Sequence, residues 1–284
     1  MLLSGGSDNF SIAVFAGPGQ AMAMTQQRDA GSQAAPILGS RHAAVPPGLR
    51  IYAIGDIHGR ADLLATLLLT ILADINARPS ATPLVVLLGD YVDRGPYSAR
   101  VIEIILTTRE KLPLVALAGN HEFYALRFLR DPEFGQRWFP LGGRATLTSY
   151  GLIVPPKPSA RMFRDLSQTF GLAFPESHRD LLMSLPTSFG IGDYVFVHAG
   201  VEHGQALGLQ SAESLTTIRE PFLSSPHHLG RIIVHGHTVV GRPEIREGRI
   251  NIDTGACTTN RLTCLVLEGA SLRFLESGTE PARS

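Results

Sequence analysis

The sequence predicts an α/β fold with two β-sheets, on three observations. In the first half of the chain, three apolar segments are each followed by a segment whose apolar side chains recur at helical spacing, which is typical of parallel strand–helix units. From residue 193 onward, four apolar segments follow one another without long helices between them, which predicts a second, mostly antiparallel sheet. The hydrophobic fraction of 44% and the charged fraction of 18% are those of a globular protein with a sizeable core.

The strand–helix units are predicted between residues 49 and 129. Strands are expected in LRIYAIGD (49–56), TPLVVLLGD (82–90) and LPLVALAGN (112–120). Helices are expected in GRADLLATLLLTILADIN (59–76), in PYSARVIEIILTT (96–108), which begins with a proline, and in HEFYALRFL (121–129). Residues 130–190 are less regular and predict one helix, in SHRDLLMSLP (177–186). The strands of the second sheet are expected in DYVFVHAG, RIIVHGHT, RINIDTGA and LTCLVLEG.

The chain divides into an arm and one domain. Residues 1–48 are rich in Gly, Ala, Ser, Gln and Pro, which predicts a flexible N-terminal arm, with residues 49–284 as a single domain. The alternative for the arm is an export signal, because SIAVFAGPGQAMA resembles an apolar region before a small-residue cleavage site. The basic start that such signals carry is missing, so the arm remains the favoured interpretation.

Charge and cysteine content exclude several classes of protein. Lys plus Arg and Asp plus Glu both number 25, so no overall field attracts nucleic acid or an anionic membrane surface. The apolar runs are too short to span a bilayer. Cys257 and Cys264 form neither a disulfide framework nor a Cys-x-x-Cys motif, which favours reduced thiols in a cytoplasmic protein.

Polar clusters follow the predicted strands at their carboxyl ends, where ligands bind in α/β sheets. These clusters read Gly-Asp-Ile-His-Gly (55–59), Gly-Asp-Tyr-Val-Asp-Arg-Gly (89–95), Gly-Asn-His-Glu (119–122), His-Ala-Gly (198–200) and His-Gly-His-Thr (235–238). Each cluster alone is explained by a turn, a helix cap or a hydrogen-bonded core histidine. Five of them, all rich in the Asp, His and Asn donors that divalent metals accept, predict one metal site.

These motifs resemble those of the phosphoprotein phosphatase family of metallophosphoesterases, which read GDxHG, GDxVDRG, GNHE, HAG or HGG, and GHT. The match runs from Ile51 to Ala256 and is strongest to bacterial serine/threonine phosphatases, which share GDIHGRADLL and GGRATLTSYG. One departure is Thr217, which stands where the family usually has tryptophan. The resemblance implies a sandwich of two mixed β-sheets flanked by helices.

The resemblance also implies a role for each matching residue. Asp56 and His58 would bind one metal, and Asp90 would bridge both metals. The second metal would be completed by Asn120, His198 and His237. His121 would be the general acid, oriented by Asp93. Arg94 and Arg219 would hold the phosphoryl oxygens, a task suited to planar, forked donors. In the family the histidine before Thr in Gly-His-Thr is the ligand, so His235 is expected to pack behind the site.

The reaction that the resemblance implies is removal of phosphate from phosphoserine and phosphothreonine by direct attack of a hydroxide that bridges the metals. The cofactors would be two divalent ions, with manganese favoured and iron or zinc as alternatives. The partner would be a phosphoprotein or phosphopeptide.

Two other functions stay open. A symmetrical dinucleoside tetraphosphate hydrolase has the same fold, but usually carries another residue at the position of Asp93 and GNHD in place of GNHE. A non-catalytic phosphoprotein-binding module is expected to lack metal ligands or His121, and none is missing here.

Overall fold

The computed structural model describes residues 30–38, 40–225 and 230–278. Its first sheet has six strands, with β4, β5 and β6 parallel and the others antiparallel to their neighbours. In spatial order these strands are β1 (Ala30–Ala34), β13 (Ser271–Ser277), β12 (Leu262–Glu268), β4 (Leu49–Ile54), β5 (Thr82–Leu87) and β6 (Leu114–Ala116).

The second sheet has five strands and is also mixed. In spatial order they are β10 (Glu244–Arg246), β11 (Arg249–Asn251), β9 (Ile232–His235), β8 (Tyr194–Val197) and β7 (Ser188–Ile191). The pairs β8–β9 and β9–β11 are parallel, so the prediction of a mostly antiparallel sheet is wrong. The reason lies in the connections: the long segment with α8 (Ala212–Thr217) separates β8 from β9, and β10 separates β9 from β11.

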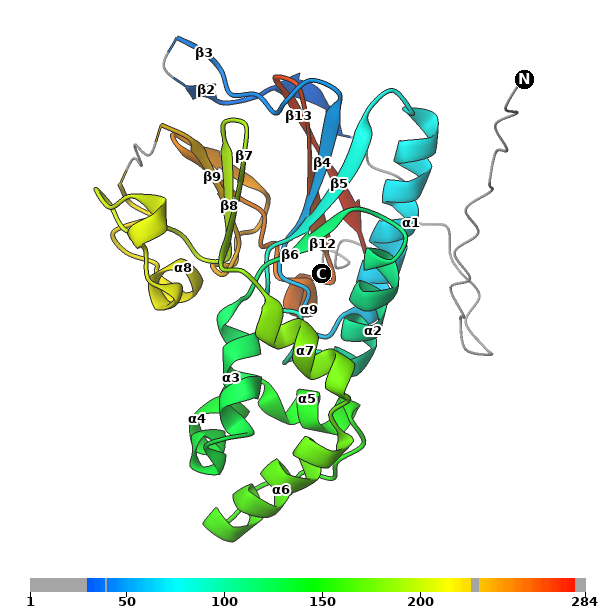
Figure 1. Ribbon diagram of the computed structural model, residues 1–284, viewed down its shortest axis with the longest axis vertical. Helices are drawn as coiled ribbons and strands as arrows, with labels where there is room; N and C mark the ends of the chain where they lie inside the picture. Colours follow the sequence, from blue (N-terminus) through cyan, green and yellow to red (C-terminus); the bar gives the residue numbers. More distant parts are fainter. Residues whose placement is uncertain (1–29, 39, 226–229, 279–284) are drawn as a thin grey trace, which may run out of the picture.

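The two sheets face each other and form a sandwich (Figure 1). Between them lies a buried cluster of apolar side chains from both sheets, including Ile51 and Val86 from the first sheet and Phe196, Val234 and Ile250 from the second. The outer face of the first sheet carries a larger apolar cluster, which helices cover. This arrangement confirms the predicted α/β fold with two mixed sheets and flanking helices.

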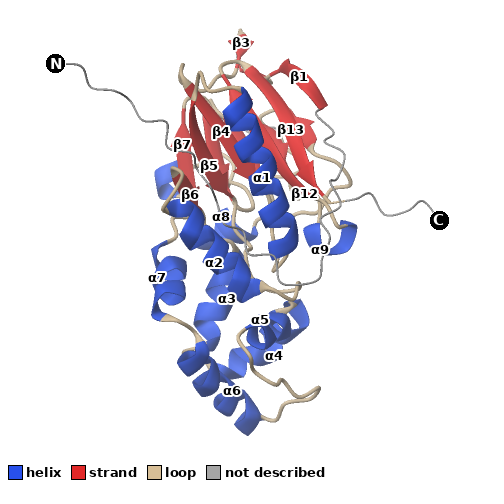
Figure 2. Cartoon of the chain, turned by 90° about the vertical axis from the view of Figure 1, so that its right-hand side faces the viewer, coloured by secondary structure: helices blue, strands red, loops and turns tan. Residues whose placement is uncertain are grey.

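The helices lie outside the sandwich, and α1 runs along the outer face of the first sheet (Figure 2). They are α1 (Ala61–Ala77), α2 (Ser98–Arg109), α3 (Asn120–Phe128), α4 (Gly135–Trp138), α5 (Gly143–Ser149), α6 (Ala160–Ala173), α7 (Glu176–Ser184) and α9 (Ala256–Thr259), besides α8. The segment expected to be irregular is largely helical, and α6 was not predicted there. No helix of the described residues combines the length and apolar character needed to cross a bilayer.

The boundary predicted at residue 48 needs correction. Residues 1–29 lie outside the described residues, but β1 pairs with β13, and a small hairpin of β2 (Ile37–Leu38) and β3 (Arg41–His42) follows it. The side chains of Ala35, Ala43 and Val45 are buried in the cluster between the sheets. Residues 30–48 therefore belong to the folded domain, because these small apolar side chains fill space between the sheets.

Candidate metal and phosphate site

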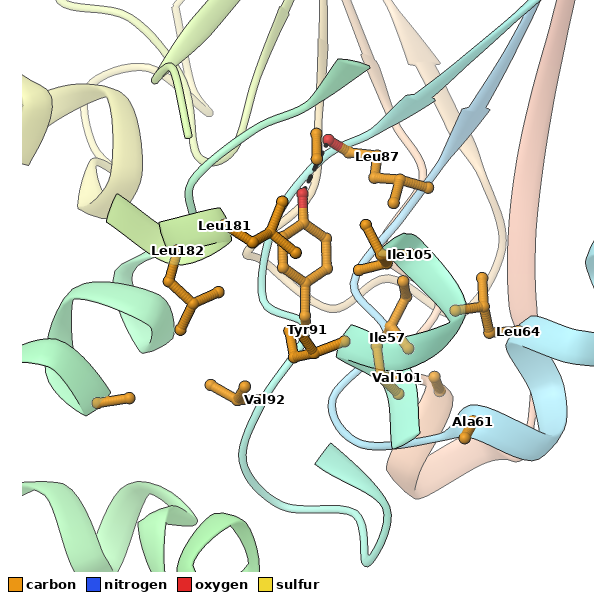
Figure 3. Close-up of a cluster of buried hydrophobic side chains, with 14 of the residues drawn as sticks. Ile57, Ala61, Leu64, Leu87, Tyr91, Val92, Val101, Ile105, Leu181 and Leu182 are labelled. Carbon is orange, nitrogen blue, oxygen red and sulfur yellow. Dashed lines mark hydrogen bonds between the residues drawn. The ribbon is translucent and has the colours of Figure 1, made fainter. Parts of the chain in front are cut away.

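The loops that carry the predicted site residues are held in place by buried apolar side chains. In the loop after β5, Tyr91 points into the core beside Ile57 and Ile105, and Val92 joins the same cluster on the side of Leu182 (Figure 3). The Tyr91 hydroxyl donates a hydrogen bond to the carbonyl of Leu117, at 2.5 Å. Such packing fixes the loop, so the polar residues on either side of Tyr91 and Val92 are turned toward the site.

The backbone at the site is conformationally unusual. Among the described residues, six that are not glycine have positive φ: His58, Asp90, Asp93, Arg94, His237 and Asn260. The first five of these are predicted site residues. Positive φ is costly for residues with a β-carbon and persists only where the surrounding structure imposes it, which is typical of functional sites.

Asp90 lies between two groups of potential metal ligands. Its Oδ2 atom is 3.3 Å from Nε2 of His58 and 3.7 Å from Nε2 of His121. Its Oδ1 atom is 3.4 Å from Nε2 of His198, on the other side. A β-carbon at Gly119 would overlap this carboxylate, so glycine is needed where that chain passes Asp90. The geometry fits the predicted bridging role.

The second group brings together the ligands predicted for the second metal. Nε2 of His198 lies 3.2 Å from Nδ1 of His237 and 3.2 Å from Oδ1 of Asn120. Asp90, His198 and His237 place their ligand atoms within 4.8 Å of one another, and so do His58, Asp90 and His121. Among the described residues, Asp56 belongs to neither of these groups.

Asp56 is held at the edge of the second group. Its carboxylate accepts a hydrogen bond from the backbone N–H of His237, at 3.0 Å, and a β-carbon at Gly236 would overlap it. Burial, followed by the negative charge of Asp253, raises the pKa of Asp56 well above its usual value. Asp253 is itself 2% exposed, and we did not single it out in the sequence. Two buried carboxyl groups side by side are the kind of environment that a cation stabilises.

The donor set fits divalent metal ions. The Nδ1 atoms of His58 and His198 lie 2.9 and 3.0 Å from the carbonyls of Val92 and Leu88, which leaves each Nε2 facing the site. Nε2 of His58 is buried and has no hydrogen-bond partner among the described residues. Burial lowers the pKa of His58 to about 3, so the imidazole is neutral and offers a lone pair.

Asp90 and His198 carry charge states that also suit a cation. Burial opposes ionisation of Asp90, but the neighbouring histidines outweigh it and hold its pKa well below the usual value. For His198 burial would lower the pKa, yet Asp90 and Asp56 raise it to about 10. The negative carboxylates that favour a proton on His198 would equally favour a metal cation in place of that proton.

His121 forms a buried dyad with Asp93, as predicted. Its Nδ1 lies 2.6 Å from Oδ2 of Asp93, and the Trp138 indole N–H donates to the same oxygen, also at 2.6 Å. The Thr146 hydroxyl donates to Oδ1 of Asp93, at 2.5 Å. Burial would lower the pKa of His121, but Asp90 and Asp93 outweigh it and raise the pKa. The dyad therefore presents Nε2 of His121 toward Asp90, and the raised pKa favours the protonated form of the imidazole.

The two predicted phosphate-binding arginines lie at the surface of the site. Arg94 is exposed, with Nη2 at 3.4 Å from Nε2 of His121. Arg219 is also exposed, and its positive charge is one of the causes, after burial and His198, that lower the pKa of His237 to about 3. Both arginines thus place an exposed positive charge beside the histidines of the site.

Comparison with known proteins places this site in a family. The family model described as "Calcineurin-like phosphoesterase" matches residues 49–242, which contain every predicted site residue. The chain belongs to the calcineurin-like phosphoesterase family. It is accordingly a metal-dependent phosphoesterase.

Two curated relatives of this family member carry the same name. A protein of Oceanobacillus iheyensis, "Bis(5'-nucleosyl)-tetraphosphatase PrpE [asymmetrical]", is 27% identical over 76% of this chain and 87% of its own length. A Bacillus cereus protein of the same name is 30% identical over 75% of this chain and 88% of its own length.

Solved structures show the same fold. The crystal structure of a putative diadenosine tetraphosphatase gives a TM-score of 0.55 at 18% identity, covering 84% of this chain and 99% of that chain. A cold-active protein tyrosine phosphatase gives 0.50 at 19% identity, covering 79% of this chain and 77% of that chain.

Several residues support the phosphoesterase site without having been predicted to do so. The carboxylate of Glu122 accepts the backbone N–H groups of Asp90, Tyr91 and Gly119 at 2.8–2.9 Å, which ties α3 to the loop after β5. In the sequence, Glu122 stands out only as part of the Gly-Asn-His-Glu motif. The sequence does not indicate that Trp138 and Thr146 bind Asp93, because they lie more than 40 residues away from it and no motif links them to it.

The two histidines of His-Gly-His-Thr have different surroundings, as expected. His237 joins the ligand group, whereas His235 is fully buried on the other side of the strand end. The ring of His235 packs edge-on against Phe222, and its Nε2 lies 3.4 Å from Nη1 of Arg249. Through these contacts His235 packs behind the site and does not face the ligand group.

Proposed function

We propose that the protein removes phosphate from phosphoserine and phosphothreonine of proteins or peptides. The observation that carries this proposal is the buried His121–Asp93 dyad, with 2.6 Å between the imidazole Nδ1 and the carboxylate. A serine or threonine alkoxide is a strongly basic leaving group, so its departure needs a proton from a positioned acid. A site built around such an acid suits alkyl phosphate esters.

The residues of this chain would divide the work as follows. Asp56, His58, Asp90, Asn120, His198 and His237 would hold two divalent ions, with manganese favoured and iron or zinc as alternatives. When bound, such ions supply charge neutralisation at the phosphoryl group and lower the pKa of bound water. Arg94 and Arg219 would bind the phosphoryl oxygens, and His121 would donate its Nε2 proton to the leaving oxygen while Asp93 holds Nδ1.

A second candidate is hydrolysis of a dinucleoside tetraphosphate, favoured by the relatives whose names state that activity. They carry the asymmetrical form of the name, whereas the sequence had suggested the symmetrical form as the rival. The same arginines and histidines could hold an internal phosphoryl group. In that reaction the leaving group is a nucleotide phosphate, which is a weaker base and depends less on His121.

Parallel assays separate the two candidates. Manganese-loaded protein would be given a phosphoserine peptide, a phosphothreonine peptide and diadenosine tetraphosphate, with phosphate and nucleotide release followed at matched concentrations. His121→Asn, purified in the same way, controls for contaminating phosphatases. The proposal expects higher kcat/KM on the peptides and a larger effect of His121→Asn there. Higher kcat/KM on diadenosine tetraphosphate would establish the second candidate instead.

A further inference from the structure

The turn that carries Arg219 follows α8 on the outer face of the second sheet (Figure 1). Side chains on both sides of Arg219 are anchored there: Ile218 packs against a buried apolar cluster, and Phe222 belongs to it. The same cluster contains Val195 of β8 and Ile233 of β9, which alternate with the side chains that face the first sheet. The backbone of the turn is therefore fixed on the sheet, while Arg219 itself is exposed.

Two of the sequence motifs at the site provide the surface on which Phe222 rests. A β-carbon at Gly200, in His-Ala-Gly, would lie only 2.4 Å from the Phe222 ring, so glycine is needed there. The ring of His235, in His-Gly-His-Thr, lies edge-on to the Phe222 ring, with 4.9 Å between the ring centroids. The turn is thus in contact with both segments that carry the histidines of the second ligand group.

Arg249 ties the other end of this turn to the second sheet. It lies in β11 and is 6% exposed. Its Nη2 donates a hydrogen bond to the backbone carbonyl of Leu223, at 3.0 Å, and its Nη1 donates to the carboxylate of Glu244, at 2.8 Å. The backbone N–H of Leu223 in turn donates to the carbonyl of Arg219, at 2.8 Å. Two successive hydrogen bonds therefore connect the buried arginine with the backbone of the exposed one.

We propose that Arg249 is a positioning residue for phosphate binding, which acts through Arg219 and does not itself contact the substrate. A long, exposed side chain loses rotamer entropy when it binds an anion, and the total cost of ordering is smaller when its backbone is already held in place. A guanidinium suits this role, because its fork donates to a carbonyl and a carboxylate at the same time, which the ammonium of lysine cannot do in the same geometry. This role rests on the proposed function in one respect: Arg219 must bind phosphoryl oxygens.

Steady-state hydrolysis of an aryl phosphate by the manganese-loaded protein tests this role, with inorganic phosphate as a competing inhibitor. In Arg249→Gln, KM and the inhibition constant of phosphate should both rise about three- to tenfold, which is within the range of coupling between residues of one hydrogen-bond network. Turnover and metal content should change little, because the lost interaction is present in the bound substrate as well as in the transition state. Arg249→Lys, which keeps the charge but not the fork, should shift both constants in the same direction and covers the case in which Arg249→Gln does not fold.

Glu244→Gln is the matched control. It removes the negative charge of the ion pair with Arg249, but keeps an oxygen that can accept from Nη1 and leaves the bond to the Leu223 carbonyl in place. The melting temperature should fall in both variants, whereas KM should stay unchanged in Glu244→Gln. A lowered melting temperature with unchanged KM in Arg249→Gln as well would make Arg249 a structural residue only, and would overturn the proposal.

The decisive measurement repeats Arg249→Gln in a protein that already carries Arg219→Ala. Arg219→Ala alone should raise KM and the inhibition constant at least about tenfold, as expected for a lost charge-assisted hydrogen bond, and the second substitution should then add nothing. Effects that multiply in the double variant, or an unchanged KM in Arg219→Ala, would overturn the proposal. An aryl phosphate reports on phosphoryl binding alone, so a preference of the protein for diadenosine tetraphosphate over phosphopeptides would refute the proposed function and leave this result standing.

Discussion

Replacing Asp93 by asparagine removes one charge from the proposed acid while keeping its geometry. Oδ2 of Asp93 receives two donors, the imidazole Nδ1–H of His121 and the indole N–H of Trp138, both at 2.6 Å. The indole can only donate, so the asparagine must place its carbonyl oxygen at this position. Its amide nitrogen then faces the Thr146 hydroxyl, which can accept. The tautomer of His121 is therefore preserved, and only the charge of its partner is lost.

The size of the effect follows from the hydrogen bond that changes. A bond to a charged partner contributes about 1.5–3 kcal/mol and a neutral one about 0.5–1.5, so the imidazolium loses about 1–2 kcal/mol of stabilisation. The weaker bond lowers the pKa of His121 and with it the fraction that is protonated, so at a pH above that pKa turnover of an alkyl phosphate should fall by up to roughly 5–30-fold, at about 1.4 kcal/mol per tenfold. An aryl phosphate, whose phenolate leaves readily without a proton, should lose much less. His121→Asn, which removes the acid, should cost about 10²–10⁴-fold on the alkyl substrate.

The assay is the ratio of kcat on an alkyl phosphate to kcat on an aryl phosphate, measured with the same manganese-loaded preparations. Glu103→Gln is the matched control, because Glu103 accepts from the buried His178, at 2.8 Å, in the helical layer away from the site. That control should leave the ratio unchanged. Equal losses on both substrates for Asp93→Asn and His121→Asn would refute the acid assignment and make His121 a metal ligand or a structural residue.

Three further predictions follow from contacts in the structure. His237→Ala should bind fewer than two metals and lose almost all activity, whereas His235→Ala should keep both metals and lose mainly stability; metal analysis of the two purified variants decides between them. Deleting residues 1–45 should lower the free energy of unfolding by about 3 kcal/mol, because the buried side chain of Val45 and the backbone hydrogen bonds to the turn between β12 and β13 are lost. Deleting residues 1–29 should change the free energy of unfolding little. Equal melting temperatures for the two deletion variants would contradict the corrected boundary. Burial would raise the pKa of Asp74, but Tyr52 and Arg273 lower it below its usual value, so its stabilising effect is fully present above about pH 4 and is lost as the pH falls through the folded-state pKa. In urea unfolding, the stability difference between the protein and Asp74→Asn should therefore shrink steadily as the pH falls below about 4, and a difference that stays constant there would be evidence against this ion pair.

The strand–helix half of the fold could be predicted because its signals are local. Each of β4, β5 and β6 is an apolar run that ends in a glycine and polar residues, and α1 repeats leucine and isoleucine at helical spacing. The pairing within the second sheet could not be predicted in this way. Whether β8 and β9 are parallel depends on a long connection that crosses the sheet, and spacing alone does not give its direction.

The site residues that stand in a sequence motif could be predicted. Their contact partners, which come from segments without a motif, could not. Asp90, Asp93 and His121 stand in motifs, and the structure brings them together. Trp138 and Asp253 reach the site from a helix and a strand end that carry no recognisable pattern. Residues 30–48 were misjudged for a related reason. Their composition resembles a flexible arm, yet the few apolar side chains among them are buried between the sheets.

Metal content of the Asp90 variant tests the central claim most directly. The protein and Asp90→Asn would be stripped with chelator, reloaded with manganese, and analysed for bound metal and for aryl phosphate hydrolysis. Asp193→Asn, which changes an aspartate paired with Arg41 far from the site, serves as the control. We predict two ions per chain and full activity in the protein and the control, and at most one ion with almost no activity in Asp90→Asn. Two bound ions and full activity in Asp90→Asn, or activity in the protein that survives chelation, would contradict the account.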